Sequence, residues 1–298
     1  MTRAEEGLLL LCCPLGDAEV RPLTAARYRA LARAVAERAQ EKGALRDVTE
    51  RDLIKLGCAE EEAARIVRLL GREALLRRYL AAAERRGFFV LTRLSEDYPA
   101  ALRRKLGQDA PAALFCAGDR TLLRREGAAL VGSRALSAGG ERFARAVGRT
   151  AAREDLVLVS GGAAGADTAA QDACLDAGGQ VVCFLADALS TRVKTMPENA
   201  LYCAELGWDI PFSAPRALSR NRLIHALPDR ALVAQTDCGR GGTWAGTVEN
   251  LRHGWSDVFV RDDGSEGASA LIERGASPVG PDGPASIRAL VPNQTRLF

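Results

Sequence analysis

Aromatic residues are scarce in this sequence, since Phe, Tyr and Trp together make up 5% of its 298 residues. A surface that stacks on flat ligands would have to use these few rings, or arginine planes in their place. Histidine is rarer still, because only His225 and His253 occur, and neither has a cysteine at zinc-ligand spacing. We therefore expect no metal site and no bound cofactor.

No pair among the eight cysteines has the Cys-x-x-Cys spacing of a redox motif or a zinc site. Cys116 and Cys183 fall inside apolar runs typical of buried strands, where a thiol behaves as a small hydrophobe. Free thiols at such positions indicate a reducing compartment, so we expect a cytoplasmic protein. The apolar run at residues 8–13 is too short to cross a bilayer, and it follows two glutamates instead of a basic segment. No membrane association is expected.

The net charge of +3 is too small to indicate a nucleic-acid partner by itself, and it does not exclude one. Basic residues are nevertheless concentrated in one stretch: Arg103, Arg104, Lys105, Arg120, Arg124 and Arg125. The simplest interpretation of this stretch is a solvated face.

The first part of the chain has helical periodicity. Thr24 is a candidate N-cap, and Thr49 with Asp52 has the spacing of a capping box. Gly57 is placed to end the helix that follows Thr49. We expect residues 1–86 to form a small all-helical domain, similar to SAM or helix-hairpin-helix domains.

After Gly87 apolar strands alternate with helices. Strands are expected at residues 88–91, 112–116, 128–131, 156–159, 180–185, 230–235 and 257–260, and helices at 140–153, 167–177 and 247–253. This alternation predicts an α/β fold, with an extended Rossmann-like parallel sheet over residues 87–277. Residues 278–298 contain several prolines and are expected to form a flexible tail.

Two of the strands are expected to end in ligand-binding turns. After the strand at 128–131, Gly132 allows a close approach of the backbone, Ser133 offers a hydroxyl, and Arg134 can clamp a phosphate. An ordinary strand-to-helix turn explains this segment equally well. After the strand at 156–159, residues 160–166 are small and leave backbone N–H groups uncovered at a helix N-terminus, as in an anion site. The spacing matches neither a dinucleotide fingerprint nor a Walker A motif, and Asp167 is expected to cap the helix.

Two further segments are candidates for ligand binding. Ser219-Arg220-Asn221-Arg222 precedes an expected helix at residues 223–227, and a Gly-rich loop with Gly241, Gly242 and Thr243 follows the strand at 230–235. The carboxyl ends of parallel strands lie at one edge of a sheet, so these loops are expected to converge there.

The motifs and their order along the chain resemble those of the DprA/Smf family of DNA-processing proteins. The resemblance covers residues 8–277 and rests on Tyr98-Pro99, Pro111-x-x-Leu114-Phe115-x-x-Gly118, Val131-Gly132-Ser133-Arg134, the segment Ser160–Asp167, Arg220-Asn221-Arg222 and Leu271-Ile272-x-x-Gly275-Ala276. It implies an extended Rossmann fold that binds single-stranded DNA, forms a homodimer, delivers the strand to RecA during DNA uptake or recombination, and catalyses no reaction.

The resemblance also implies roles for individual residues. Arg134 would be the principal phosphate clamp, Lys194 would meet a second phosphate, and Asn221 and Arg222 would shape the rim. A backbone anion cradle would be formed by Ser160, Gly161, Gly162 and Gly165. The chain departs from the family pattern where Gln171 replaces a histidine and where Gly241-Gly242-Thr243 replaces a Ser-Gly-Ser-x-x-Thr loop. A C-terminal winged helix, which many members carry, is not expected.

Two other functions stay open. Gly241-Gly242, Gly246-Thr247 and Glu249 are similar to the motif of LOG-type phosphoribohydrolases, in which a glutamate acts on the N-glycosidic bond of a nucleoside monophosphate, although the spacing differs. A non-catalytic nucleotide-sensing module would use the same anion cradle. His225 is expected to be packed in the core, and for Trp244 core packing is favoured over base stacking.

The last residues suggest a further partner. Gln294, Leu297 and Phe298 have the spacing of a peptide that docks onto the bacterial sliding clamp.

Overall fold

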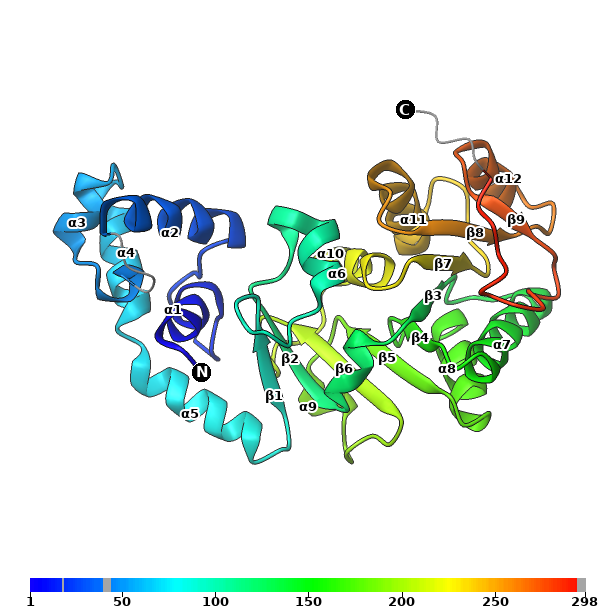
Figure 1. Cartoon of the computed structure of the whole chain (residues 1–298), viewed down its shortest axis with the longest axis horizontal. Helices are drawn as coiled ribbons and strands as arrows, with labels where there is room; N and C mark the ends of the chain where they lie inside the picture. Colours follow the sequence, from blue (N-terminus) through cyan, green and yellow to red (C-terminus); the bar gives the residue numbers. More distant parts are fainter. Residues whose placement is uncertain (18, 40–43, 294–298) are drawn as a thin grey trace.

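The computed structural model describes residues 1–17, 19–39 and 44–293. The chain is elongated, with helices at the N-terminal end and a large sheet through the rest (Figure 1). The fold class is confirmed as mixed α/β with an N-terminal helical region. The boundary of the helical domain at residue 86 stays a prediction.

The described part of the N-terminal region contains five helices; the first four pack around their own apolar cluster, whereas the fifth packs against the cluster beneath the sheet. They are α1 (Arg3–Cys12), α2 (Ala25–Ala39), α3 (Glu50–Lys55), α4 (Glu60–Leu70) and α5 (Glu73–Glu84), with a 3₁₀ turn at Ala44–Asp47. The expected capping box at α3 is present, since the Thr49 hydroxyl and the Asp52 carboxylate each accept a backbone N–H of the other residue. The helical run after Gly57 is split into α4 and α5 near Gly71.

Helix α1 joins this region to the sheet. Leu8 and Leu11 pack among the N-terminal helices, whereas Leu9 and Leu10 belong to the cluster beneath the sheet. A helix with apolar residues on all sides is suited to such a position between two layers. The guanidinium of Arg72 donates to the carbonyl groups of Leu10 and Cys13, and so satisfies acceptors at the C-terminal end of α1.

One nine-stranded sheet has the order β1-β2-β6-β5-β4-β3-β7-β8-β9. The strands are β1 (Phe89–Thr92), β2 (Ala113–Gly118), β3 (Gly127–Val131), β4 (Val157–Ser160), β5 (Gln180–Leu185), β6 (Ala200–Glu205), β7 (Arg230–Val233), β8 (Asp257–Arg261) and β9 (Ser277–Val279). The expectation of a parallel sheet holds from β6 to β9, but β2 runs antiparallel to both β1 and β6. Strands β6 and β9 were not anticipated from the sequence.

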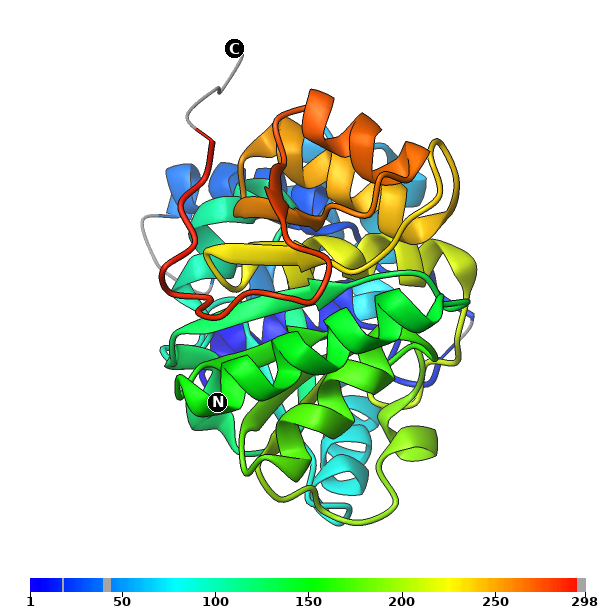
Figure 2. The same cartoon turned by 90° about the vertical axis from the view of Figure 1, so that its right-hand side faces the viewer.

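Helices cover both faces of the sheet (Figures 1 and 2). On one face lie α7 (Ala138–Arg153) and α8 (Ala166–Asp176), which pack closely against each other. The other face carries α6 (Ala100–Leu106), α10 (Ala214–Ala226), α11 (Gly241–His253) and α12 (Glu266–Glu273). A short helix, α9, spans Leu189–Arg192.

Strand β3 is the point where the strand order reverses. From β3 the chain proceeds through β4, β5 and β6 in one direction, and it later returns to β7 on the other side of β3. A crevice opens at such a switch point, beyond the carboxyl ends of the strands, and it is the usual ligand site of open α/β sheets.

The expected flexible tail is largely packed against the sheet region. Ile287 is fully buried, and the backbone N–H groups of Ile287 and Arg288 each donate to Glu154, at 3.1 Å. Residue 278 itself belongs to β9. Buried apolar contacts and a carboxylate acceptor therefore hold residues up to about Leu290 in place. None of the helices in the described part of the chain has the length and apolar character needed to cross a membrane.

Candidate functional site

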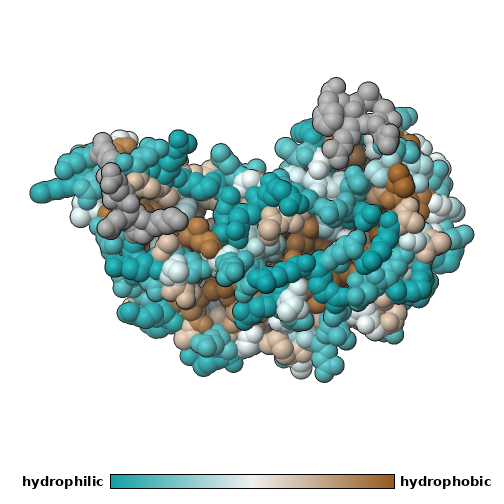
Figure 3. Space-filling model, viewed as in Figure 1, coloured by the Kyte–Doolittle hydropathy of each residue, from teal (hydrophilic) through white to brown (hydrophobic). Residues whose placement is uncertain are grey.

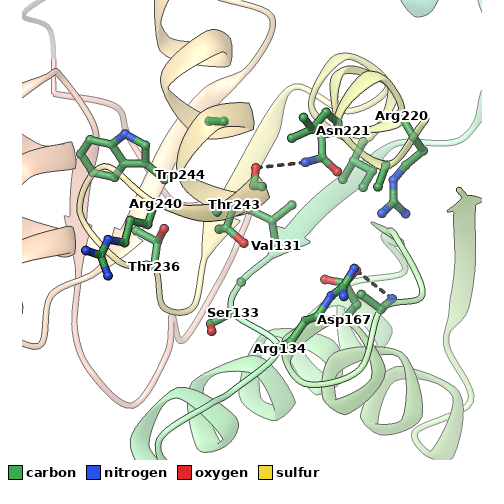
Figure 4. A pocket seen from close by; sticks show the side chains of 18 of the residues that line it. Val131, Ser133, Arg134, Asp167, Arg220, Asn221, Thr236, Arg240, Thr243 and Trp244 are labelled. Atoms are coloured by element: carbon green, nitrogen blue, oxygen red, sulfur yellow. Dashed lines mark hydrogen bonds between the residues drawn. The ribbon is translucent and has the colours of Figure 1, made fainter. Parts of the chain in front are cut away.

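A pocket of about 800 Å³ lies at the switch point, and we call it the strand-end pocket. The turns after β3 and β7, the start of α8, and helices α10 and α11 line it (Figure 4). Eight of the sequence-predicted site residues are brought together here: Gly132, Ser133, Arg134, Asp167, Asn221, Gly241, Gly242 and Thr243. The predicted convergence of loops at one edge of the sheet is therefore observed.

Arg134 supplies an exposed positive charge to this pocket. It follows Gly132 and Ser133 in the turn after β3, and its side chain extends toward Asp167 (Figure 4). Among the residues that the structure describes, no hydrogen bond or ion pair engages its guanidinium. A guanidinium in this state can donate two parallel hydrogen bonds to a phosphate.

Close backbone packing holds the Arg134 turn in place. A Cβ atom on Gly132 would lie 2.5 Å from the Cβ atom of Ala166, at the start of α8. Gly165 has a φ of +87°, and a Cβ atom there would lie 2.6 Å from the carbonyl oxygen of Ser133. The N–H of Ala166 donates to that same oxygen at 3.2 Å. Gly165 therefore braces the two loops against each other.

The carboxylate of Asp167 occupies the cradle that we expected to hold a phosphate. Its Oδ2 atom accepts the N–H groups of Gly161 at 3.1 Å and Ala163 at 3.2 Å. Burial raises the pKa of Asp167, whereas the Arg220 guanidinium lowers it. The prediction that Asp167 caps the helix was wrong, because Gly165 is the N-cap. Asp167 lies inside α8, and its carboxylate reaches back to the preceding loop.

The remaining cradle residues lie outside the pocket lining. Ser160 is fully buried, and the side-chain amide of Gln171 donates to its hydroxyl. Gln171 stands where the family resemblance leads one to expect histidine, and here it is part of the core beneath the loop. Gly162 is also outside the lining, and its carbonyl accepts from Arg192 at 2.5 Å.

Arg220 forms a buried positive wall of the pocket. Its segment was expected either to hold phosphate or to brace neighbouring loops, without an individual role for Arg220. Its side chain is 7% exposed, and its Nη1 donates to the carbonyl groups of Gly161 and Phe184. Its Nε has no hydrogen-bond partner in the part of the chain that the structure describes. The expectation that Arg220-Asn221-Arg222 precedes a helix was wrong, since all three residues lie within α10.

Asn221 lines the pocket and Arg222 does not. The amide of Asn221 donates to the carbonyl of Gly242 at 3.0 Å and so links α10 to α11 (Figure 4). Arg222 points instead to Glu205 on β6, with 3.1 Å between Nη2 and Oε2. Burial raises the pKa of Glu205, and the charge of Arg222 lowers it. Arg222 thus compensates a buried charge and is not brought to the rim.

Lys194 also lies away from the pocket. Its side chain is exposed after α9, and its Nζ donates to the carbonyl of Ser190 at 3.4 Å. The role proposed for Lys194 as a second phosphate contact stays a prediction that the pocket geometry does not support.

The predicted Gly-rich loop is the first turn of α11. Gly241, Gly242 and Thr243 begin this helix, and Arg240 at the N-cap makes no side-chain capping bond. The first N–H groups of α11 therefore lack a side-chain cap at the rim, where they add partial positive charge. The exposed side chain of Arg240 lies on the same side of the pocket as Trp244 (Figure 4).

Apolar side chains complete the rim. Phe212 is 51% exposed and Leu218 is 50% exposed, and both line the pocket. Trp244 is half-buried, packs on the core beneath it, and lies 5.1 Å from the guanidinium carbon of Arg274. The sequence offered Trp244 as a candidate, but nothing in the local pattern distinguished Phe212 or Leu218 from core residues.

The basic stretch of the sequence belongs to another part of the surface, and acidic neighbours neutralise much of it. Arg120 and Arg124 pair with Asp97, and Lys105 pairs with Asp229. None of these residues lines the strand-end pocket. The interpretation as a solvated face therefore agrees with the ion pairs.

The chemistry that the site offers is binding of an anion beside flat apolar groups. His225 lies at the back of the pocket and is 1% exposed, and its Nδ1 accepts from the amide of Asn250 at 3.1 Å. Burial lowers the pKa of His225 to about 4, so the ring is neutral at pH 7. Glu249, the candidate glycosidase residue, is exposed on α11 and is not part of the lining. In the described ranges, no group of three or more acidic, histidine or cysteine side chains is arranged to hold a metal ion.

Two relatives resemble the chain in sequence. Protein Smf of Escherichia coli (strain K12) is 32% identical over 196 residues, which cover 61% of this chain and 51% of the relative. DNA processing protein DprA of Streptococcus pneumoniae (strain ATCC BAA-255 / R6) is 33% identical over 187 residues, which cover 57% and 64%. The chain thus spans less than two thirds of the length of these relatives.

Two solved structures resemble the fold. DprA from Streptococcus pneumoniae superimposes with a TM-score of 0.71 at 26% identity, over 95% of this chain and 96% of that one. DprA from Helicobacter pylori, described for its single-stranded DNA binding mode, gives a TM-score of 0.54 at 25% identity, over 64% and 90%. The family model of DNA recombination-mediator protein A matches residues 89–286. With most of its length inside that match, the chain belongs to the DNA recombination-mediator protein A family.

Proposed function

We propose that this chain binds single-stranded DNA in the strand-end pocket and acts in DNA uptake or recombination. The observation that carries the proposal is the guanidinium of Arg134, which lines the pocket and has no ion pair or hydrogen bond to any described residue. Arg240 and the N-terminal turn of α11 add positive charge on the opposite side. A DNA strand with one phosphate near Arg134 would place a second phosphate near the positive charge on the other side of the pocket.

Preference for a single strand follows from the apolar rim. Phe212, Leu218 and Trp244 offer surfaces on which unpaired bases can lie. In a duplex the base faces are stacked inside the helix, so only the phosphates would be available. The Helicobacter pylori relative, described as binding single-stranded DNA, supports the same conclusion for this chain.

The carboxylate in the cradle limits which ligands fit. Asp167 already accepts the N–H groups of Gly161 and Ala163, so a nucleotide phosphate has no free cradle there. This favours an elongated polyanion that touches Arg134 and α11 over a mononucleotide that depends on the loop at residues 160–165. Glu249 lies outside the pocket, so we expect no release of base from nucleoside monophosphates.

Several partners belong to the same proposal. We infer a homodimer and delivery of the bound strand to RecA, both on family resemblance. Docking onto a sliding clamp would use Gln294, Leu297 and Phe298, which lie outside the described residues. A cytoplasmic location is supported by the eight free cysteines, among them Cys116 and Cys203, whose sulfur atoms lie 3.4 Å apart on paired strands.

The test is fluorescence anisotropy with a labelled oligothymidine over a salt series. Arg134→Ala should weaken binding about tenfold or more, because it removes a charge-assisted contact. It should also reduce the slope of log K against log salt by about 0.7 if one phosphate contact is lost. Arg149→Ala, at an exposed arginine of α7 outside the pocket, is the matched control. Equal binding by wild type and Arg134→Ala would overturn the assignment of the site.

A competition experiment tests the choice of ligand. Unlabelled single strand should displace the probe at lower concentration than duplex of the same length. Nucleoside monophosphates should not displace it, and free base should not appear in the mixture. Release of base that depends on Glu249 would instead establish the glycosidase function.

A further inference from the structure

A second, smaller cavity lies between the N-terminal helices and the edge of the sheet. Its volume is about 230 Å³, and its walls come from α1, α2, the segment after β1, and Ala112. Leu94 is 49% exposed and lines the cavity, so it borders on solvent. The surface between the N-terminal region and the rest of the chain is hollowed in the view of Figure 3.

Two arginines line this cavity. Arg29 is on α2, and Arg93 directly follows β1. Both terminal nitrogens of Arg29 are buried and have no hydrogen-bond partner among the residues that the structure describes. The guanidinium of Arg93 donates a long hydrogen bond, from Nη1 to the carbonyl of Ala110 at 3.3 Å. In the described ranges, no carboxylate forms an ion pair with either guanidinium.

The charges around the pair are mostly of the same sign. Burial lowers the pKa of Arg93 most strongly, and the charges of Arg29 and Arg103 lower it further. The nearby carboxylate of Glu5 is engaged elsewhere, since it accepts from the hydroxyl groups of Ser95 at 2.6 Å and Thr92 at 3.0 Å. Burial raises the pKa of Tyr28, a further lining residue, to about 12, so this phenol is neutral. The cavity wall therefore carries uncompensated positive charge.

We propose that this cavity is a binding site for a small oxyanion, phosphate or sulfate, held between Arg29 and Arg93. Buried charges in proteins are ordinarily paired, and an unpaired guanidinium is costly. Two planar forks of donors match the oxygens of a tetrahedral anion. The cavity is smaller than the roughly 300 Å³ at which drug-sized ligand pockets begin, so an inorganic anion fits it better than a whole nucleotide.

An anion at this place would connect two parts of the chain. Arg29 belongs to the N-terminal helices, whereas Arg93 belongs to the sheet region. The bound anion would replace the repulsion between the two guanidinium groups with attraction to a shared charge. Binding should therefore stabilise the whole chain by mass action. This proposal does not depend on DNA binding in the strand-end pocket.

The test is the thermal unfolding midpoint of the full chain in sodium phosphate, compared with sodium chloride at equal ionic strength. The wild-type midpoint should rise with phosphate and reach saturation. Arg29→Met and Arg93→Gln should each abolish the phosphate-specific rise. Arg33→Met is the matched control, because Arg33 is an exposed arginine of the same helix that pairs with Glu37. Arg134→Ala should keep the rise, which separates this site from the strand-end pocket.

A second readout is the thermal unfolding midpoint of the variants in the absence of phosphate. Arg29→Met should unfold at the same temperature as the wild type or a few degrees higher, since it removes an unpaired buried charge. A midpoint that falls in Arg29→Met while the phosphate response persists would overturn the proposal. So would a wild-type protein that responds equally to phosphate and chloride.

Calorimetry keeps the proposal testable if the variants do not fold. Titration of the wild-type protein with inorganic phosphate should show one site per chain that sulfate also occupies, and that remains when the strand-end pocket is saturated with oligothymidine. The absence of such a site would refute the proposal. Stronger binding of adenosine monophosphate than of phosphate would also refute it, because the cavity is argued to admit the anion alone.

Discussion

The guanidinium of Arg220 fills the space in which a side chain at position 161 would lie. A Cβ atom built on Gly161 would be 2.6 Å from Cζ of Arg220, and Nη1 donates to the Gly161 carbonyl. Arg220 can therefore reach from α10 to the loop after β4 only because that position is glycine. This contact fixes a buried positive charge beside Asp167 in the wall of the pocket.

We expect Gly161→Ala to displace Arg220 and to destabilise the protein. Overpacking in a closed site of this kind costs about 1–3 kcal/mol. Urea unfolding followed by circular dichroism would measure the loss. Gly280→Ala is the control, since a Cβ atom on Gly280 meets nothing within 4 Å. Equal losses for the two variants would contradict the proposed contact.

Trp244 should report ligand binding by its fluorescence. Trp208 and Trp255 are 9% and 7% exposed and do not line the pocket, whereas Trp244 does. We expect oligothymidine to quench the intrinsic fluorescence, and Trp244→Phe to remove this quenching while binding persists by anisotropy. Trp255→Phe should keep the quenching. Quenching that survives in Trp244→Phe would place the bases elsewhere.

Arg222 should matter for stability more than for DNA binding. Its removal leaves the buried Glu205 carboxylate without its partner, and one oxygen of that carboxylate already has no hydrogen bond. Arg222→Met should cost about 3–5 kcal/mol in the free energy of unfolding. Combining it with Glu205→Gln should restore most of this loss.

The effect of Arg222→Met on DNA binding is the control for its effect on stability. The folded fraction of Arg222→Met should bind oligothymidine nearly as tightly as the wild type does. A loss of binding as large as that of Arg134→Ala, with little change in stability, would assign Arg222 to the rim after all.

His225 should make stability depend on pH. Burial lowers its pKa from the ordinary 6.5 to about 4, so the unfolded chain binds a proton at a pH where the folded chain does not. Stability is therefore greatest above pH 6.5 and falls as pH decreases toward 4, by about 3 kcal/mol in total from this group.

Urea unfolding of wild type and His225→Gln over this pH range would measure the effect. The wild type should lose stability relative to the variant as pH falls. His253→Gln, which removes the exposed histidine, should follow the wild type. A wild-type curve parallel to that of His225→Gln would contradict the expected protonation.

Local patterns predicted much of the fold because their physical signals lie close together in the chain. The capping box of Thr49 and Asp52 and the apolar run of β3 are visible within a few residues. Strand β6 was missed because its apolar run is short and ends in Glu205, whose charge is compensated by Arg222 of α10. The start of α10 was missed because Pro215 suggests a loop, although proline is favourable in a first helical turn.

The candidate site was predicted in part for the same reason. The position of Arg134 after a buried strand is a local feature, and the pocket contains it. The positions of the Asp167 and Arg222 side chains depend on partners outside their own helices. No local pattern predicts that the Asp167 carboxylate will bond to the loop before its helix, or that Arg222 will pair with the buried Glu205.

The carboxylate of Asp167 has a consequence for inhibitor chemistry. A compound whose phosphate or phosphonate group is directed at the backbone N–H groups of Gly161 and Ala163 would have to displace an anion that is part of the chain itself. Compounds directed at this protein should instead carry a flat ring for the surfaces of Phe212 and Trp244, joined to a single acid that reaches Arg134. Such molecules would differ from nucleotide mimics, and selectivity over nucleotide-dependent enzymes would follow from that difference.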